Sequence, residues 1–547
     1  MFNTFLILAA SYVNPVLYAD FPNPDVCVSE EDGRAYLTAA SFDRRPALPI
    51  LSSDDLVNWS YVGHALPVDF DDVVLTPSIR YCSDKREFVI YWNDPENGVF
   101  RISALRPTGP WSEPRRVIDY DAEDVPEGGM TDPCPLYDDD GRIYLVNGWD
   151  ASKSGLDSSV LTVRELNADE TKGIGAPVLV YDGAADGLSD CTGVKFYRHN
   201  GEYWLFFSAK AEGAWRQVVA RAKTPYGPYE ARTVLSQEKP DGYGLRAGAW
   251  VSRLVSDEAL TSVRQEDWLV GSRDQGAYGR TVALEPMVWP ADAWPRVGKD
   301  GRPTASGVMP SSVSEKRVPQ AQLPFGGLAV GDEFDGLRLG PQWHYANRTW
   351  QCAAWSSSYG FFRLNSTSVD RCASKGSSLG SGKVEQPWLA ENLVVQRFPA
   401  ERFEAVLKSA VVAKGDAQEA GLVVQGRNSA RIGLKYNEKK AEFEVVYVES
   451  QMDKNRAWNR KTIVLGVFSA RTVGQVHSAE VFFRLQVASG ASCAFAWSTD
   501  GKDWKPAPAA FSAVSDDDGG ATFGLYAISP PESEMRGWID ADWIRVR

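Results

Sequence analysis

Four polar residues recur at similar places along the first part of the chain, and one of them is an acid. Asp132 stands in MTDPCPLY, and Asn23, Thr76 and Thr192 stand in FPNPDV, LTPSIR and DCTGVKFY. Each precedes an aromatic residue by 11 to 13 positions. A carboxylate can exchange a proton near neutral pH, whereas an amide or an aliphatic hydroxyl can only hydrogen-bond there. The four are therefore candidates for one polar pocket with one acid-base group.

Asp132 carries the strongest chemical signal of the four. Its neighbours Met130, Pro133 and Cys134 indicate a buried surrounding, in which a carboxylate is costly unless it is paired, so its presence there favours a functional role. The alternative is a turn-forming Asp-Pro step, which needs no function.

The aromatic residues that follow these positions belong to five similar strand-like segments. The segments are RAYLTAAS (34–41), REFVIYWN (86–93), GRIYLVNGW (141–149), GEYWLFFSA (201–209) and EDWLVGSRD (266–274). Their central aromatics, Tyr36, Phe88, Tyr144, Tyr203 and Trp268, are spaced by 52, 56, 59 and 65 residues. A turn in LRPTGPWSEPRRVI (105–118) also returns in AKTPYGPYEARTVL (222–235). This period predicts a five-bladed β-propeller with one blade per repeat, whose innermost strands carry the four polar residues to the axis.

Length and composition place this propeller in a larger all-β protein. The chain has 547 residues, too many for one core, with 19 Trp and 47 Gly. Residues 14–295 carry the repeats, 296–329 are rich in Pro, Gly and Ser and predict a linker, and 330–547 show regular short strands that predict a β-sandwich. The formal net charge of −14 argues against nucleic acid or an anionic membrane as a partner.

The N-terminus and the cysteines bear on the compartment. MFNTFLILAASYV has a short apolar run without a basic start, which indicates either a curtailed signal peptide, and hence a secreted or periplasmic protein, or a short first strand. No segment is long enough to span a membrane. The seven cysteines show no metal-binding spacing. If the chain is secreted, we expect Cys352 and Cys372 to be bridged and the other five to be buried thiols.

Several blocks of the chain resemble glycoside hydrolase family 43. They are NPVLYADFPNPDV (14–26), LPILSSDDLVNWSYVGHAL (48–66), TDPCPLYDDDGRIYL (131–145) and YGRTVALEPMVW (278–289). The family has a five-bladed propeller and contains β-xylosidases and α-L-arabinofuranosidases. Through DEFDGLRLGPQW and DADWIRVR, the second half resembles the concanavalin-like β-sandwich (jelly roll) of its β-xylosidase branch. The resemblance implies a glycosidase without a catalytic cofactor, acting on xylose- or arabinose-containing plant-wall glycans.

The catalytic positions depart from this family. Its inverting hydrolysis uses a general base and a general acid roughly 6.5–9.5 Å apart, with a third carboxylate that tunes the acid. Carried over residue by residue, the tuning carboxylate falls on Asp132, the base on Asn23 and the acid on Thr192. An amide cannot take a proton from water, and a threonine hydroxyl is too weak an acid to protonate a leaving group efficiently.

Two further carboxylates offer an alternative to lost chemistry. Asp25 lies two residues from Asn23, and Asp190 lies two residues from Thr192. Strand residues two apart share a face, so a catalytic pair displaced by about 7 Å is conceivable. A relocated active site and an inactive one both remain open at this point.

The resemblance also suggests residues that hold a sugar. Arg280, in YGR, matches a family position that points into the pocket. Arg246 stands where the family has an axial histidine, and Arg44 and Arg45 replace a loop that supplies a pocket aromatic. Trp92 is a further binding candidate, with a core position as its alternative.

Three functions fit these residues. The first is a glycosidase for xylose- or arabinose-containing glycans, and the second is a catalytically silent carbohydrate-binding protein. The third is a glycosidase for an acidic sugar, with Arg44, Arg45 and Arg246 as a cationic lip.

A structural calcium ion is also expected in the β-sandwich. The first and last strands of this kind of domain lie together, and calcium takes 6–8 oxygen ligands. Asp332 and Asp542 are the predicted ligands, with Asp540 as a third choice.

Overall fold

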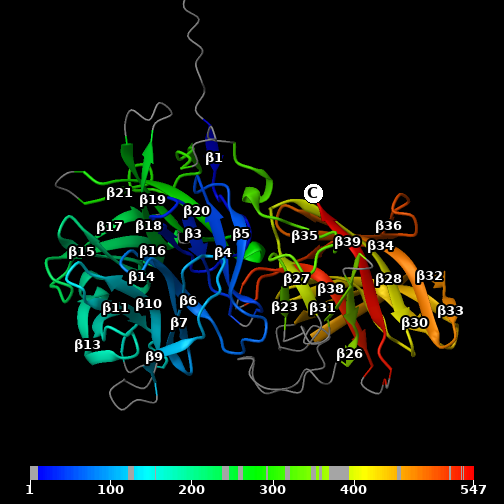
Figure 1. Ribbon diagram of the computed structural model, residues 1–547. Coiled ribbons are helices and arrows are strands. Elements are labelled where there is room, and N and C mark those ends of the chain that lie inside the picture. The colour runs from blue at the N-terminus through cyan, green and yellow to red at the C-terminus, as the bar shows by residue number, and fades with distance from the viewer. Residues whose placement is uncertain are drawn as a thin grey trace, which may run out of the picture.

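The computed structural model contains the two predicted β domains side by side (Figure 1). It describes residues 10–42, 44–120, 129–153, 156–236, 245–256, 263–290, 294–313, 321–346, 353–356, 360–368, 393–452, 458–516, 519–530, 533 and 535–547. Helix in these ranges is limited to short 3₁₀ turns: η1 (Gly183–Asp186), η2 (Gly276–Tyr278) and η3 (Pro324–Gly327). Five four-stranded sheets form the first domain, and two larger sheets form the second.

Each of the five sheets is one blade, with its strands in sequence order. Blade one holds β2 (Asp25–Val28), β3 (Ala35–Thr38), β4 (Ala47–Ser53) and β5 (Ser60–Leu66). Blade two holds β6 (Leu75–Cys82), β7 (Glu87–Asp94), β8 (Gly98–Ala104) and β9 (Arg115–Asp119). Blade three holds β10 (Met130–Tyr137), β11 (Ile143–Trp149), β12 (Val160–Leu166) and β13 (Gly173–Asp182). Blade four holds β14 (Ser189–His199), β15 (Glu202–Ala211), β16 (Ala214–Ala222) and β17 (Glu230–Ser236), and blade five holds β18 (Arg246–Ser256), β19 (Val263–Asp274), β20 (Arg280–Val288) and β21 (Arg296–Val297).

The predicted repeat corresponds to the second strand of each blade. The five central aromatics lie on β3, β7, β11, β15 and β19. One apolar cluster lies between each pair of neighbouring blades, and the five central aromatics belong to three of these clusters. Tyr36 of blade one, for example, meets Phe88 of blade two edge to face, with ring centroids 5.1 Å apart. The period thus arises because every blade must bury two faces against its neighbours.

The first strands of the blades line the axis. Consecutive first strands pack against one another around the ring, and β18 contacts β2. The segment before β2 completes this closure, because Leu17 exchanges backbone hydrogen bonds with Val282 of β20 and the Phe21 N–H donates to the Arg280 carbonyl. The two ends of the propeller sequence are thereby joined beside the axis.

The segment predicted as a linker contributes to the propeller. β21 (Arg296–Val297) is the outer strand of blade five, and β22 (Ser306–Val308) pairs with β1 (Ser11–Val13). Tyr12 of β1 is fully buried, and its hydroxyl donates to the Leu284 carbonyl. Ser11–Val13 therefore form the short first strand that was one reading of this region, whereas residues 1–9 lie outside the described ranges.

The second domain is a two-sheet sandwich around one large core. One sheet has the order β23-β27-β38-β29-β30-β31-β32, with β26 beside β38. Its strands are β23 (His344–Ala346), β26 (Thr367–Ser368), β27 (Leu393–Arg397), β29 (Glu419–Gln425), β30 (Ser429–Asn437), β31 (Glu442–Met452), β32 (Trp458–Ser469) and β38 (Thr522–Ser529). The other has the order β24-β25-β39-β28-β34-β35-β36, with β33 and β37 at its edges. Its strands are β24 (Ala353–Ser356), β25 (Phe361–Asn365), β28 (Phe403–Ala413), β33 (Arg471–Val473), β34 (Val476–Ala488), β35 (Ser492–Ser498), β36 (Lys505–Pro506), β37 (Phe511–Ser512) and β39 (Trp538–Val546).

Tyr278 joins the two domains near the propeller axis. Its ring is buried against the sandwich core. Its hydroxyl accepts a hydrogen bond from the Ala491 N–H at 2.8 Å and donates to the Glu401 carbonyl at 2.8 Å. One phenol thus pairs two backbone groups of the sandwich.

Replacing this phenol should weaken the domain junction. We expect Tyr278→Phe to cost about 1–3 kcal/mol, because it leaves the buried Ala491 N–H without its partner. The measurement is the urea midpoint of the full chain. Tyr226→Phe is the matched control, because Tyr226 is 38% exposed. Equal midpoints for the two variants would contradict this role of Tyr278.

Candidate functional site

The polar residues at the axis stand on irregular parts of the first strands. The strand pairing shifts register between Leu75 and Ser78, Thr131 and Cys134, Thr192 and Lys195, and Arg246 and Ala249. Within these shifts, Thr76, Asp132, Gly193 and Ala247 have left-handed backbones, with φ of 36°, 54°, 66° and 51°. A bulge of this kind re-aims a side chain, and left-handed non-glycine residues concentrate at functional sites.

In blade four, the pairing of β14 with β15 corrects the predicted position of the axial residue, which assumed the same distance to the central aromatic as in the other blades. Gly193, not Thr192, occupies the backbone position of Thr76 and Asp132, and Thr192 corresponds to Thr131. The prediction differed by one residue because the hairpin between β14 and β15 is shorter than the spacing of the other blades suggests. Thr192 nevertheless reaches the axis.

Asp132 lies at the centre of a group that includes Thr76 and Thr192. Its Oδ2 accepts a hydrogen bond from the Thr192 hydroxyl at 3.1 Å, and its backbone N–H donates to Thr76 Oγ1 at 2.9 Å. The side chain is buried, and Oδ1 has no hydrogen-bond partner among the described residues. Burial raises the pKa of Asp132, although the charge of Lys195 and hydrogen bonds from Gly193 and Thr192 oppose the rise. Asp132 is therefore an axial carboxyl with a tendency to hold its proton.

Asn23 belongs to a second group, formed with blade five. Arg280 Nη1 donates to Asn23 Oδ1 at 3.4 Å, and Arg280 Nε lies 3.9 Å from Asp274 Oδ1. Arg246 forms an ion pair with the other oxygen of Asp274. The guanidinium of Arg246 also lies over the ring of Trp215, 4.4 Å from its centroid.

Sequence reasoning missed Asp274 and Trp215. Asp274 is the last residue of the fifth repeat and lies two positions after Ser272, the strand partner of Arg246. The alternation of strand faces could therefore have placed Asp274 beside Arg246. Trp215 follows a tight turn between β15 and β16, and only the folded hairpin brings it to the axis.

The two carboxylates considered for a relocated site are held by other partners. Asp25 is fully buried, and its Oδ2 accepts hydrogen bonds from the Ile79 N–H at 2.9 Å and from Arg80 at 2.7 Å. Asp190 pairs with Lys210 at 2.9 Å and accepts a hydrogen bond from Ser158, and the Lys210 hydrogen bond lowers the pKa of Asp190. Asp25 thus stabilises the packing of blades one and two instead of facing a ligand.

Three of the predicted sugar contacts are structural residues. Arg44 pairs with Asp20 at 3.1 Å and donates to the Gly520 carbonyl, so it joins the propeller to the sandwich. Arg45 is 3% exposed, and its backbone pairs with Tyr345 of the sandwich. Trp92 is fully buried and stacks on Phe100 between blades one and two. Charge and aromatic type selected these residues from the sequence, but their neighbours assign them to packing.

The predicted calcium ligands are likewise occupied. The Asp332 carboxylate accepts hydrogen bonds from the backbone N–H groups of Phe334 and Gly340 and from the indole N–H of Trp343. Asp540 makes a two-pronged ion pair with Arg363, and Asp542 pairs with Lys408. Within the described ranges, no three His, Cys, Asp or Glu side chains gather where they could hold a metal. These three carboxylates are paired with protein groups, and calcium binding in the sandwich stays a prediction.

Five of the seven cysteines lie in the described part of the chain, and two lie outside it. Cys27, Cys82, Cys134, Cys191 and Cys493 are buried free thiols, as predicted. Cys352 and Cys372 lie outside the described residues, so their pairing stays a prediction. In the described part of the chain, no helix has the length and apolar character needed to cross a bilayer.

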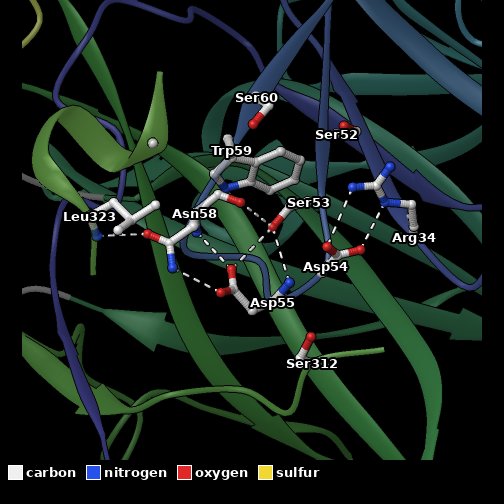
Figure 2. A pocket seen from close by; sticks show the side chains of 11 residues that line it. Arg34, Ser52, Ser53, Asp54, Asp55, Asn58, Trp59, Ser60, Ser312 and Leu323 are labelled. Carbon is white, nitrogen blue, oxygen red and sulfur yellow. Dashed lines mark hydrogen bonds and ion pairs between the residues drawn. The ribbon is translucent and has the colours of Figure 1, made fainter. Parts of the chain in front are cut away.

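The DLVNW block (55–59) builds a turn beside a small cavity. Figure 2 shows Asp55 facing Asn58, and Arg34 facing Asp54. Asp55 Oδ1 accepts hydrogen bonds from two backbone N–H groups, and the Leu323 N–H donates to Asn58 Oδ1 at 2.7 Å. The cavity measures about 70 Å³, far below the ~300–1,000 Å³ of ligand pockets. This block therefore holds the interdomain segment on blade one.

Comparison with known proteins agrees with the fold and with the sequence blocks. The model of glycosyl hydrolases family 43 matches residues 12–295. The chain belongs to this family. The model of the beta xylosidase C-terminal concanavalin A-like domain matches residues 331–547.

Related proteins in this family extend over most of the chain. A protein named non-reducing end alpha-L-arabinofuranosidase, from Bacteroides ovatus, is 27% identical over 81% of this chain and 79% of its own length. A beta-xylosidase of Formosa agariphila is 24% identical over 97% of this chain and 90% of its own. Among solved structures, a GH43 protein of Bacillus licheniformis covers 98% of this chain and 99% of its own, with a TM-score of 0.75 at 23% identity. At 23% identity, the similarity to this solved structure shows the fold alone.

Proposed function

We propose that this family 43 protein binds a xylose- or arabinose-containing glycan at the propeller axis and hydrolyses it very slowly or not at all. The names of its relatives support the sugar class. The main support for the loss of hydrolysis is the set of hydrogen bonds made by Asn23 and Thr192 at the axis. Asn23 accepts a hydrogen bond from Arg280, and Thr192 donates one to Asp132. Neither side chain can serve as an effective general base or general acid near neutral pH.

Hydrolysis through relocated carboxylates has less support. Asp25 is fully buried against Arg80, and Asp190 pairs with Lys210. A general base must reach the water that it activates, which Asp25 does not do in this packing.

The test is the turnover of aryl-xylosides and aryl-arabinofuranosides by wild type, Asp190→Asn and Asp25→Asn. We expect at most trace turnover by wild type and no change in Asp190→Asn. Asp25→Asn should lower stability, because it leaves Arg80 without its buried partner. Robust turnover lost in Asp190→Asn would support relocation. Robust turnover that survives both changes would contradict both accounts and the axial placement of the site.

A further inference from the structure

The charges at the axis point to a more specific ligand. We propose that Arg246 and Arg280 recognise a sugar that carries a carboxylate, a uronic acid, at the same axial site. This inference rests on the proposed function and names the substrate class of its binding site.

The first argument is the charge balance. Arg246 and Arg280 both approach one carboxylate, Asp274. The third group beside them, Asn23, is neutral, and its Oδ1 lies 3.4 Å from Arg280 Nη1. Two guanidinium groups therefore share one negative charge, which leaves an excess positive charge at the axis of a chain whose net charge is −14.

The second argument is the state of Arg246. Its Nε is buried and has no hydrogen-bond partner among the described residues. Burial and the neighbouring charge of Arg280 lower the pKa of Arg246 to about 10. Its guanidinium is held in place by stacking on Trp215. A guanidinium that is held in place and whose side chain is 25% exposed is a prepared site for an anion.

The third argument is access. The side chains of Arg246, Arg280 and Asp274 are 25%, 29% and 35% exposed, so a ligand can reach them. The two other arginines of the predicted cationic lip are engaged in packing: Arg44 pairs with Asp20, and Arg45 is 3% exposed. Lys195, the cation near Asp132, is 1% exposed, so Arg246 and Arg280 are the cations that a ligand can reach in this group.

The shape of the ligand follows from the chemistry of the arginine fork. Guanidinium groups bind carboxylates through two parallel hydrogen bonds. A glucuronic acid ring equals a xylose ring with a carboxylate added at C5, so the same sugar contacts can serve both. Because the acidic chain repels anions at long range, the recognition must come from close contacts.

The experiment compares the affinities of matched methyl β-glycosides by calorimetry. The probes are methyl glucuronide, methyl xyloside, methyl glucoside and methyl glucoside 6-sulfate. We expect the glucuronide to bind at least about tenfold more tightly than the xyloside and the glucoside. Arg246→Gln and Arg280→Gln should each remove most of this preference. Arg232→Gln is the matched control, because Arg232 also stacks on a tryptophan and pairs with a carboxylate, but on the outer strand of blade four.

Asp274→Asn is expected to tighten glucuronide binding, a result that a misfolded variant would not give. Asp274 competes with the ligand carboxylate for the two arginines, so its neutral isostere should strengthen glucuronide binding several-fold relative to xyloside binding. Weaker glucuronide binding by this variant would overturn the inference.

The outcomes separate this inference from the proposed function. Equal binding of xyloside and glucuronide would overturn the uronic acid and retain a neutral glycan site. Equal binding of the sulfate ester and the glucuronide would contradict the choice of a carboxylate. A preference that persists in both arginine variants would place recognition elsewhere. Binding of none of the probes would count against the inference and the proposed function together.

Discussion

Asn23→Asp combined with Thr192→Glu is expected to raise the hydrolysis of aryl-xylosides or aryl-arabinofuranosides by at least about a hundredfold. General acid and general base assistance each contribute roughly 10²–10⁴ in rate. The carboxylate introduced at position 23 would lie beside Arg280, whose Nη1 is 3.4 Å from the present amide oxygen. This charge favours the ionised form that a base requires. The carboxyl introduced at position 192 would stand beside Asp132, the third carboxyl of the set.

Comparing the double variant with the single variants and with a control of equal size separates the effect of proton transfer from that of side-chain size. Each single change should do much less than the pair, because it leaves one proton transfer unassisted. Thr192→Gln in the wild-type background is the matched control. Its side chains at positions 23 and 192 have the same sizes as those of the double variant, but neither carries a carboxyl group. The pH dependence of kcat/KM for the double variant should be bell-shaped. A control as active as the double variant would show that the gain does not come from acid-base chemistry.

Glu170→Gln is expected to lower the free energy of unfolding by about 3–5 kcal/mol, the usual cost of breaking a buried ion pair. Glu170 is fully buried between blades two and three. It accepts hydrogen bonds from Lys85 at 2.6 Å, from Tyr91 at 2.6 Å and from Tyr137 at 2.8 Å, and it lies 3.1 Å from Arg101 Nε. The neutral amide would leave the buried Arg101 with one counter-ion, Glu87 at 3.6 Å. Urea unfolding of the full chain measures the loss.

The pH dependence of this loss has a definite sign. Burial raises the pKa of Glu170, but the hydrogen bonds from Lys85 and Tyr91 and the charge of Arg101 together lower it by more, so the net shift is downward. The stabilisation is therefore complete above the unfolded-state pKa of about 4.3 and is lost as pH falls through the folded-state value. The difference between wild type and Glu170→Gln should shrink below about pH 4. Glu31→Gln, which removes a surface pair with Arg86, should change little at any pH. A constant difference down to about pH 2 would contradict this account of Glu170.

The fold was predictable because its repeat has a packing cause. Tyr36 and Phe88 meet in one interblade cluster, and the same demand repeats at every blade interface. The boundary after blade five was not predictable in this way. β21 and β22 lie in a Pro- and Gly-rich stretch whose composition is typical of a linker, and only pairing with β20 and β1 shows that they are strands.

Thr192 lies beside Asp132, and Asn23 lies beside Arg280. Their roles in a site stay predictions, and most of the partners of the candidate residues could not be predicted. Asp25 could not be assigned correctly, since its partner Arg80 lies 55 residues away in the next blade.

Packing between segments distant in sequence accounts for the other misplaced candidates. Arg44 was chosen for its charge, but its partner Gly520 comes from the other domain. Trp92 was chosen for its ring, and the burial that excludes it depends on the contact between blades one and two.

The central claim is that the axis binds a glycan without hydrolysing it. In the most direct measurement, wild-type protein is incubated with saturating concentrations of xylo- and arabino-oligosaccharides. Calorimetry records the binding, and the hydrolysis products are followed over hours in the same samples. We predict saturable binding that Arg280→Gln weakens, with product formation no faster than about one turnover per hour. Binding accompanied by turnover near the roughly 1–10³ s⁻¹ typical of enzymes would contradict the account, because it would require an acid and a base that Asn23 and Thr192 cannot supply.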